Sequence, residues 1–156
     1  MSLDKIGIVG HGYVGRATVH ALSPVAAARF ADPAVRGAVE LAELVAWADA
    51  LFVCVPTPQA ADGRADLSIV HGVMAELASS DVRGPVVLKS TVPPRTTARL
   101  AREYRLPMVF HPEFLRERHH LADAESPKRV VLGWTESCVE AHRLGLRQLF
   151  ARRFLR

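Results

Sequence analysis

Short apolar runs and amphipathic stretches alternate along this chain. Most of the short runs are continuously apolar rather than alternating, which is typical of strands in a parallel sheet that is covered on both faces. They predict strands at residues 5–9, 28–31, 38–40, 50–55, 86–89, 108–110 and 129–132.

The stretches between these runs predict helices. Apolar side chains recur with helical spacing from Val14 to Ala21, and again over residues 66–78, where Asp66 is a suitable N-cap. Pro94 suits the first turn of another helix, and Thr135 suits the cap of a last one. The β-α alternation predicts an α/β fold, with a doubly wound, mostly parallel sheet of the Rossmann type in a single domain over residues 1–156.

Composition narrows the class of protein. Of the 156 residues, 49% are apolar and 23% are charged, as in an ordinary soluble globular domain. No apolar run is long enough to cross a membrane, and the charged Asp4 and Lys5 argue against a signal peptide. Two cysteines, Cys54 and Cys138, make no disulfide framework. We therefore expect a cytoplasmic protein with no membrane partner.

The formal net charge is +4, and arginines gather toward the C-terminal end. A basic tail of this kind could meet nucleic acid or another anionic surface. We favour a solvated helix face, because a helix dipole favours cations near a C-terminus and no aromatic residues are interleaved with the arginines. We therefore expect no nucleic-acid partner. The arginines are Arg143, Arg147, Arg152, Arg153 and Arg156.

A cluster of possible metal ligands follows the strand expected at residues 108–110. His111, His119, His120 and Asp123 lie within one short segment, but their spacing matches no zinc pattern. We expect no metal site and interpret these side chains as surface residues.

The stretch "IGIVGHGYVG" has the spacing of a dinucleotide-binding turn. Gly10, Gly12 and Gly15 follow an apolar strand and open a helix, and Asp32 lies 22 residues after Gly10, where a carboxylate can meet the adenosine ribose of NAD. The helix would point its first N–H groups at the pyrophosphate. The alternative is a glycine turn in some other α/β protein.

Ligands of open parallel sheets lie outside the carboxyl ends of the strands, so the phrases at those ends carry the most information. In chain order they are "GHGYVG", "ADALFVCVPTP", "DGRADLSIV", "KSTVPPRTT", "HPEFLRE" and "RVVLG", between Ile6 and Gly133. Together they resemble the N-terminal, NAD-binding domain of the UDP-glucose/GDP-mannose dehydrogenase family. In that family, NAD oxidises the primary alcohol of a nucleotide sugar twice, to the acid, through a covalent thioester.

The resemblance implies a role for individual residues. Thr91 would help hold a water beside the reacting carbon, Glu113 would be the general base of thioester hydrolysis, and Glu117 would lie near the nicotinamide. The cofactor would be bound by Gly10, Gly12, Tyr13, Val14, Gly15, Asp32, Val55, Thr57 and Ser90. The nucleotide-sugar substrate would be bound by Lys89, Phe114, Leu115 and Arg116.

From the residues alone, Glu113 and Glu117 are four positions apart and would face the same way on a helical turn. Two carboxylates at one site can split their pKa values, leaving one able to accept a proton near neutral pH. The alternative is a pair of surface acids.

The chain also departs from the family. The family's nucleophilic cysteine stands in a later "G-x-C-x-P-K-D" phrase, which these 156 residues do not contain. We expect Cys54 to be a small buried residue and Cys138 to open a helix, and neither to be catalytic. His111 stands where the family usually has asparagine, and the segment between Asp32 and Ala50 is shorter than the family's.

Two hypotheses follow from these departures. The chain either supplies the NAD half of a dehydrogenase whose thiol half comes from a separate chain, or it is a non-catalytic module that binds NAD or a sugar nucleotide. The resemblance also allows a homo-oligomer, because the family forms dimers.

Overall fold

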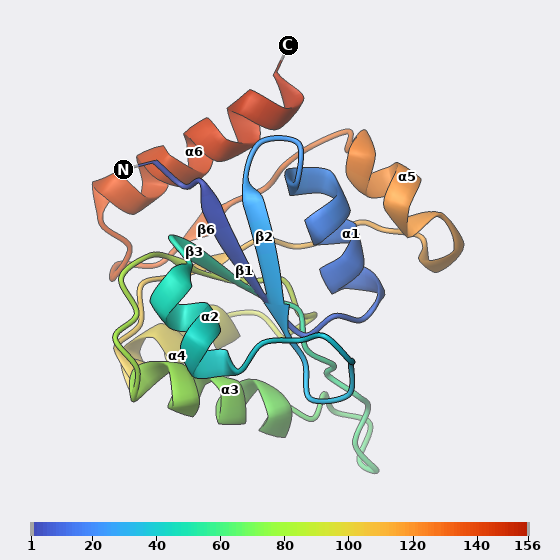
Figure 1. Ribbon diagram of the computed structural model, residues 1–156. Coiled ribbons are helices and arrows are strands. Elements are labelled where there is room, and N and C mark those ends of the chain that lie inside the picture. Colours follow the sequence, from blue (N-terminus) through green and yellow to red (C-terminus); the bar gives the residue numbers. More distant parts are fainter. Residues whose placement is uncertain (1, 156) are drawn as a thin grey trace.

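The computed structural model describes residues 2–155, which build one six-stranded sheet covered by helices (Figure 1). The strands stand in the order β2-β1-β3-β4-β5-β6. Their bounds are β1 Lys5–Val9, β2 Ala27–Ala31, β3 Ala50–Val53, β4 Val86–Leu88, β5 Met108–Phe110 and β6 Gly133–Trp134.

The direction of the strands creates a crevice. The strands β1 to β5 are parallel, and only β6 runs antiparallel, against β5. After β2, the chain crosses to the other side of β1 and continues as β3. The connections that follow β1 and β3 therefore leave the sheet in opposite directions. The carboxyl ends of these two strands form the topological switch point, where ligands of such sheets bind.

Two layers of helices cover the sheet. One face is covered by α2 (Leu41–Trp47), α3 (Ser68–Ala78) and α4 (Thr96–Tyr104). The other is covered by α1 (Tyr13–Leu22) and α6 (Glu140–Phe154), while α5 (His120–Glu125) packs against α1 after the short 3₁₀ turn η1 (Glu117–His119). Figure 1 shows α6 crossing the amino end of β1, close to the N-terminus.

Each face of the sheet carries its own apolar core. On one side Leu44, Met74 and Leu100 are fully buried against the strands; on the other, Leu22 and Leu146 are. Burial of a side chain of this size stabilises the folded state by about 1.5–3 kcal/mol. Burial on both faces explains why the strands are continuously apolar, as predicted, and the α/β doubly wound fold is confirmed.

Five of the seven predicted strands are confirmed, with 5–9 and 108–110 correct to the residue. The prediction at 38–40 is wrong: after Gly37, Ala38 donates back to the Val35 carbonyl in a turn, Val39 donates to the Phe30 carbonyl, and the chain then enters α2. The prediction at 129–132 is also wrong, because the strand that pairs with β5 comes next, at Gly133–Trp134.

Helix starts differ from the predictions for local reasons. Asp66 accepts a hydrogen bond from the Ser68 N–H, so its carboxylate serves the start of α3 although it lies two residues before the helix. The prediction that Pro94 lies in the first turn of α4 is wrong, because Arg95 adopts a left-handed conformation and the helix begins only at Thr96. Thr135 does not cap α6; its hydroxyl donates to the Met108 carbonyl, which holds the chain against β5 until Glu140.

The C-terminal arginines contact the molecule itself. Arg152 pairs with Asp4 at 2.9 Å and also donates to the Leu3 carbonyl, which ties α6 to the chain before β1. Arg153 donates to the Ala21 carbonyl of α1, and Arg143 to that of Cys138. These contacts agree with the interpretation of the arginines as part of a helix face. Arg147 lies over the ring of Trp134, and Arg156 lies outside the described residues.

No helix between residues 2 and 155 is both long enough and apolar enough to cross a membrane.

His111 joins the end of β5 to the segment before β6. Its Nδ1 lies 3.0 Å from the carbonyl oxygen of Val131, so the proton resides on Nδ1, and the ring meets Phe150 edge-on. Burial and the nearby Lys89 ammonium lower the pKa of His111 from 6.5 to about 3.

This pKa makes stability depend on pH. Between pH 6.5 and about 3, only the unfolded chain binds a proton at His111, so the free energy of unfolding decreases as the pH falls. The loss reaches about 2 kcal/mol at about pH 5. Between about pH 7 and pH 5, we expect the free energy of unfolding of His111→Asn to decrease by about 2 kcal/mol less than that of the wild type. The asparagine keeps a donor for the Val131 carbonyl but does not titrate. Urea unfolding of both proteins measures this, and equal losses would contradict it.

Candidate functional site

The glycine turn is shaped by close approaches of the backbone. Gly10 has φ +90, and a Cβ there would stand 2.8 Å from the carbonyl oxygen of Cys54. A Cβ on Gly15 would overlap the carbonyl oxygen of Gly10, so only glycine lets α1 pack this closely on β1. Gly12 differs, because nothing lies within 4 Å of the position its Cβ would take. The turn thus leaves open space at Gly12, where α1 begins.

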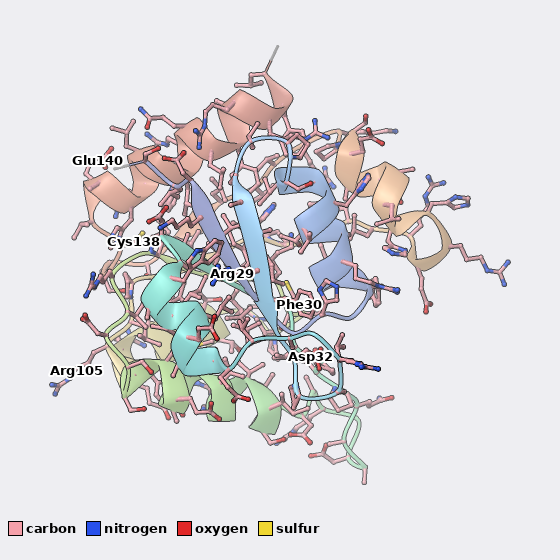
Figure 2. All side chains as sticks on the ribbon, in the orientation of Figure 1. Arg29, Phe30, Asp32, Arg105, Cys138 and Glu140 are labelled. Carbon is pink, nitrogen blue, oxygen red and sulfur yellow. The ribbon has the colours of Figure 1, made fainter. Side chains whose placement is uncertain are left out.

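Asp32 joins the ends of the first two strands. One of its carboxylate oxygens accepts from the His11 N–H at 2.7 Å, and the other accepts from the Ala34 N–H at 2.9 Å. Figure 2 shows Asp32 where β2 ends, at the opposite end of the sheet from Cys138. Each carboxylate oxygen can still accept another hydrogen bond. Asp32 therefore braces the turn and remains able to bind a ligand hydroxyl.

A cleft of about 1200 Å³ lies over the switch point between β1 and β3. Its wall comes from the glycine turn, Asp32, the segments that follow β3 and β4, and Glu113. It contains eight of the nine residues predicted to bind the cofactor; Gly15 is buried beneath the turn instead. The eight are Gly10, Gly12, Tyr13, Val14, Asp32, Val55, Thr57 and Ser90.

Hydroxyl groups tie two walls of this cleft together. The Thr57 hydroxyl donates to the Thr91 carbonyl at 2.7 Å, and the Ser90 hydroxyl donates to the Val55 carbonyl at 2.7 Å. Because each hydroxyl already donates its proton to a backbone carbonyl, it can only accept a hydrogen bond from a ligand. Thr91 itself is exposed in the cleft.

The two predicted acids do not share a helical turn. Residues 111–116 are irregular; Glu113 accepts from the Leu115 N–H at 2.6 Å, and Glu117 opens η1. The expectation that they face the same way on a helix is therefore wrong, because Pro112 and this hydrogen bond hold the segment out of helical geometry. Both still lie near Tyr13, whose pKa is raised by burial, by Glu113 and by Glu117.

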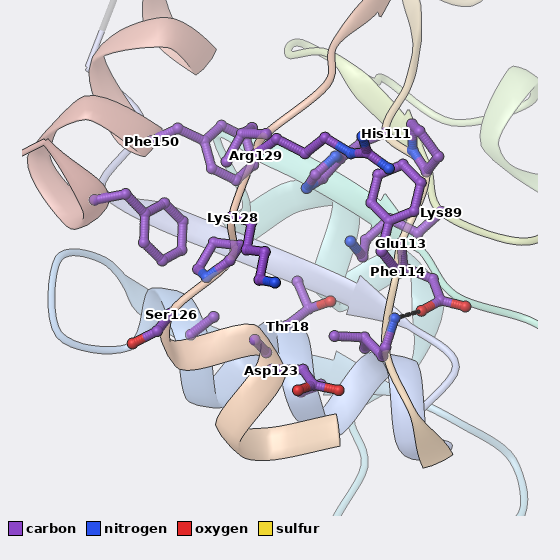
Figure 3. Close-up of a pocket in the computed structure, with 18 of the residues that line it drawn as sticks. Thr18, Lys89, His111, Glu113, Phe114, Asp123, Ser126, Lys128, Arg129 and Phe150 are labelled. Atoms are coloured by element: carbon purple, nitrogen blue, oxygen red, sulfur yellow. Dashed lines mark hydrogen bonds between the residues drawn. The ribbon is translucent and has the colours of Figure 1, made fainter. Parts of the chain in front are cut away.

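A second cavity, of about 690 Å³, lies on the α1 and α6 side of the sheet (Figure 3). It contains the predicted substrate residues Phe114, Leu115 and Arg116, and it shares Lys89 and Glu113 with the cleft. Arg116 is paired with Asp123 at 2.7 Å, which lowers the pKa of that carboxyl to about 2.

Lys89 stands where the two cavities meet. Its side chain is only 7% exposed, and burial lowers its pKa while Cys54 and Glu113 raise it. Cys54 is buried, as predicted, and burial raises the pKa of its thiol to about 11. Cys138 is buried in the turn before α6 rather than opening the helix, and burial raises its pKa too. Neither thiol is exposed or activated in this fold.

Sequence reasoning missed several side chains around these cavities. The His11 ring, inside the glycine turn, stacks on Phe30 with centroids 3.8 Å apart. Lys128 and Arg129 line the second cavity, although nothing in their spacing indicates a site. Within residues 2–155, no group of three or more His, Cys, Asp or Glu side chains is placed to hold a metal ion.

Comparison with known proteins adds sequence evidence. The NAD binding domain of the UDP-glucose/GDP-mannose dehydrogenase family matches residues 22–152, which begin after the glycine turn. UDP-glucose 6-dehydrogenase of Pseudomonas aeruginosa is 38% identical over 123 residues, which are 71% of this chain and 26% of that protein. The enzyme of the same name from Rhizobium meliloti is 39% identical over 104 residues, or 60% of this chain and 24% of that protein.

Solved structures agree in fold. UDP-glucose dehydrogenase from Pyrobaculum islandicum superposes with a TM-score of 0.77 and 27% identity, over 97% of this chain and 45% of that one. A GDP-mannose dehydrogenase from Pseudomonas aeruginosa, in a ternary complex, superposes with a TM-score of 0.76 over 96% of this chain and 44% of that one. The identity is 22%, so this likeness supports the fold alone.

The chain spans about a quarter of the length of these two curated relatives. The match over residues 22–152 covers most of the chain. It includes the segments after β3 and β4 that line the cleft and the segment after β5 that lines the second cavity. The chain therefore belongs to the UDP-glucose/GDP-mannose dehydrogenase family, as its NAD-binding domain.

Proposed function

We propose that the cleft binds NAD and that the chain supplies the cofactor half of a dehydrogenase that oxidises the primary alcohol of a nucleotide sugar to the acid. One observation carries the proposal: the open Gly12 position and the Asp32 carboxylate lie in a single cleft at the switch point. A dinucleotide needs both, an unobstructed helix start for its pyrophosphate and an acceptor for its ribose.

The residues of the cleft divide by role. The first N–H groups of α1 face the pyrophosphate over Gly12, while Asp32 accepts from the ribose hydroxyls. Val55, Thr57 and Ser90 form the wall toward the nicotinamide. When bound, NAD supplies the hydride acceptor of the oxidation.

The chemistry belongs where the two cavities meet. Glu113 and Lys89 line both, so a substrate held by Phe114, Leu115 and Arg116 can present its alcohol to the cofactor there. Glu113 serves as the general base that activates water, and Thr91 holds that water. Glu117 opens η1 and lines neither cavity, so its carboxylate acts from beside Tyr13. Burial of Cys54 and Cys138 leaves the family's thiol to another segment or chain. Two free thiols also suit a reducing compartment such as the cytoplasm.

The glycine turn gives the first test. Gly12→Val places a branched side chain where the pyrophosphate approaches, so NAD binding falls below detection while the fold survives, because the site is open. Gly15→Val unfolds the turn, since its Cβ would overlap the Gly10 carbonyl. Calorimetry and circular dichroism separate the two effects. Gly72→Val, on the open face of α3, is the control that keeps NAD affinity, and normal NAD binding by Gly12→Val would contradict the site.

Cofactor choice follows from the charge of Asp32. We expect NAD to bind at least about tenfold more tightly than NADP, because the carboxylate repels a 2′-phosphate. Asp32→Asn keeps the side chain's shape and removes its charge, so it weakens NAD binding and narrows the gap. Arg29 is already engaged, since it pairs with Glu43 and lies over the Trp47 ring, so Arg36, four residues after Asp32 in the sequence, is the cation left to soften the discrimination. Equal titration curves for the two cofactors would contradict this.

Turnover gives the test of the whole proposal. We expect no NAD reduction above background when these 156 residues meet UDP-glucose, UDP-N-acetyl sugars or GDP-mannose, because both thiols are buried. NADH absorbance at high protein concentration is the measurement, with Pseudomonas aeruginosa UDP-glucose 6-dehydrogenase as positive control. Turnover on addition of a thiol-bearing partner chain supports the proposal. Robust turnover that Cys138→Ala abolishes would overturn it.

A further inference from the structure

The cofactor cleft extends beyond the glycine turn and Asp32. Past Asp32 it continues between the segment that follows β2, residues 33–41, and one face of α3. Figure 1 shows this segment and α3 at the same end of the sheet, where β2 ends. If Asp32 binds the adenosine ribose of NAD, the adenine lies in this part of the cleft, which we call the base slot.

Both walls of the base slot carry apolar side chains. Val35 and Val39 come from the segment after β2, and Ile69 and Val73 come from α3. Ile69 is 42% exposed, so a ligand that covers it removes apolar surface from water. Walls of this kind bind the flat faces of a purine, but they do not distinguish one purine from another, because purines differ in the donors and acceptors at their edges.

One carboxylate follows these side chains on α3. Glu76 lies seven residues after Ile69 and three after Val73, which places all three on one face of the helix, and Glu76 lines the same cleft. With a rise of about 1.5 Å per residue, Glu76 stands about 10 Å from Ile69 along the helix axis. Glu76 therefore marks the far end of the base slot.

The Glu76 carboxylate is available to a ligand. Among residues 2–155 it takes part in no ion pair, and the hydroxyl groups of Ser79 and Ser80 donate to the backbone carbonyl of Glu76 rather than to its carboxylate. An ionised carboxylate only accepts hydrogen bonds, so it matches a ligand group that donates. The 6-amino group is such a donor at the edge of adenine.

Glu40 is the other carboxylate of the base slot. It directly precedes α2, so the positive end of that helix lies beside it and favours its charge there. Glu76 has no helix start beside it and instead continues the face of α3 that carries Ile69 and Val73. The two acids can therefore be told apart by experiment.

We propose that Glu76 determines the base specificity of the cofactor site by accepting a hydrogen bond from the 6-amino group of adenine. This role rests on the proposed function, because it requires NAD in the cleft with its ribose at Asp32. A dinucleotide with an oxygen at position 6 of the base opposes the carboxylate with an acceptor instead of a donor, which costs affinity.

Deamino-NAD, in which hypoxanthine replaces adenine, is the probe, and calorimetry on the full chain is the measurement. We expect NAD to bind about tenfold more tightly than deamino-NAD, because only adenine donates to the carboxylate from position 6. The amide of Glu76→Gln can accept from adenine and donate to hypoxanthine, so the ratio of the two affinities falls to about one. Glu40→Gln makes the same change of charge in the same cleft, and we expect it to keep the wild-type ratio.

The outcomes separate the role of Glu76 from the NAD site itself. Equal affinities for NAD and deamino-NAD in the wild type, an unchanged ratio in Glu76→Gln, or loss of the preference in Glu40→Gln would each overturn this role and leave the NAD site in place. Binding of neither dinucleotide would overturn the proposed function and the role of Glu76 with it. Glu76 is exposed on α3, so Glu76→Gln keeps the fold, which circular dichroism verifies.

Discussion

The contact between Gly15 and the carbonyl of Gly10 is the constraint on which the cofactor cleft depends. It allows α1 to start directly at the end of β1, so the unpaired N–H groups of its first turn face the crevice instead of the core. The crevice exists because the chain leaves β2 and resumes at β3 on the other side of β1. With any side chain at position 15, α1 would move away from the sheet, and the turn would lose its position over the switch point.

Hydrogen bonds hold the remaining walls of the cleft, and they decide which groups a ligand can use. Asp32 braces His11 and Ala34, while Thr57 and Ser90 connect the segments after β3 and β4. Since these hydroxyl protons are committed, Thr57 and Ser90 can only accept hydrogen bonds from a cofactor, as Asp32 does, while the first N–H groups of α1 supply backbone donors. Backbone N–H groups are fixed in place by the fold, so they bind a diphosphate without the entropy loss of ordering long side chains.

Lys89 connects the two halves of the molecule's chemistry. It follows β4, where the parallel strands end, and its burial places one ammonium between the cofactor cleft and the second cavity. Together with burial, which is the larger cause, this ammonium lowers the pKa of His111 at the end of the next strand, β5. A buried cation that borders two cavities makes the electrostatics of one depend on what occupies the other.

The sequence by itself determined the parallel core and the cofactor turn. Continuous apolar runs identify strands that are buried on both faces, and the spacing of Gly10, Gly12 and Gly15 follows from backbone geometry, so both can be read locally. Tertiary structure decided the rest. Thr135 donates to the Met108 carbonyl, so α6 begins later than expected. Strand β6 pairs at Gly133–Trp134, directly after the apolar run at 129–132. Glu113 accepts from the Leu115 N–H, which keeps this segment out of helical geometry. Sequence reasoning named Lys89 and residues 114–116 of the second cavity through the family resemblance, but it missed Lys128 for the same reason: Lys89 and Lys128 lie 39 residues apart in the chain, and only packing of distant elements brings them to one cavity.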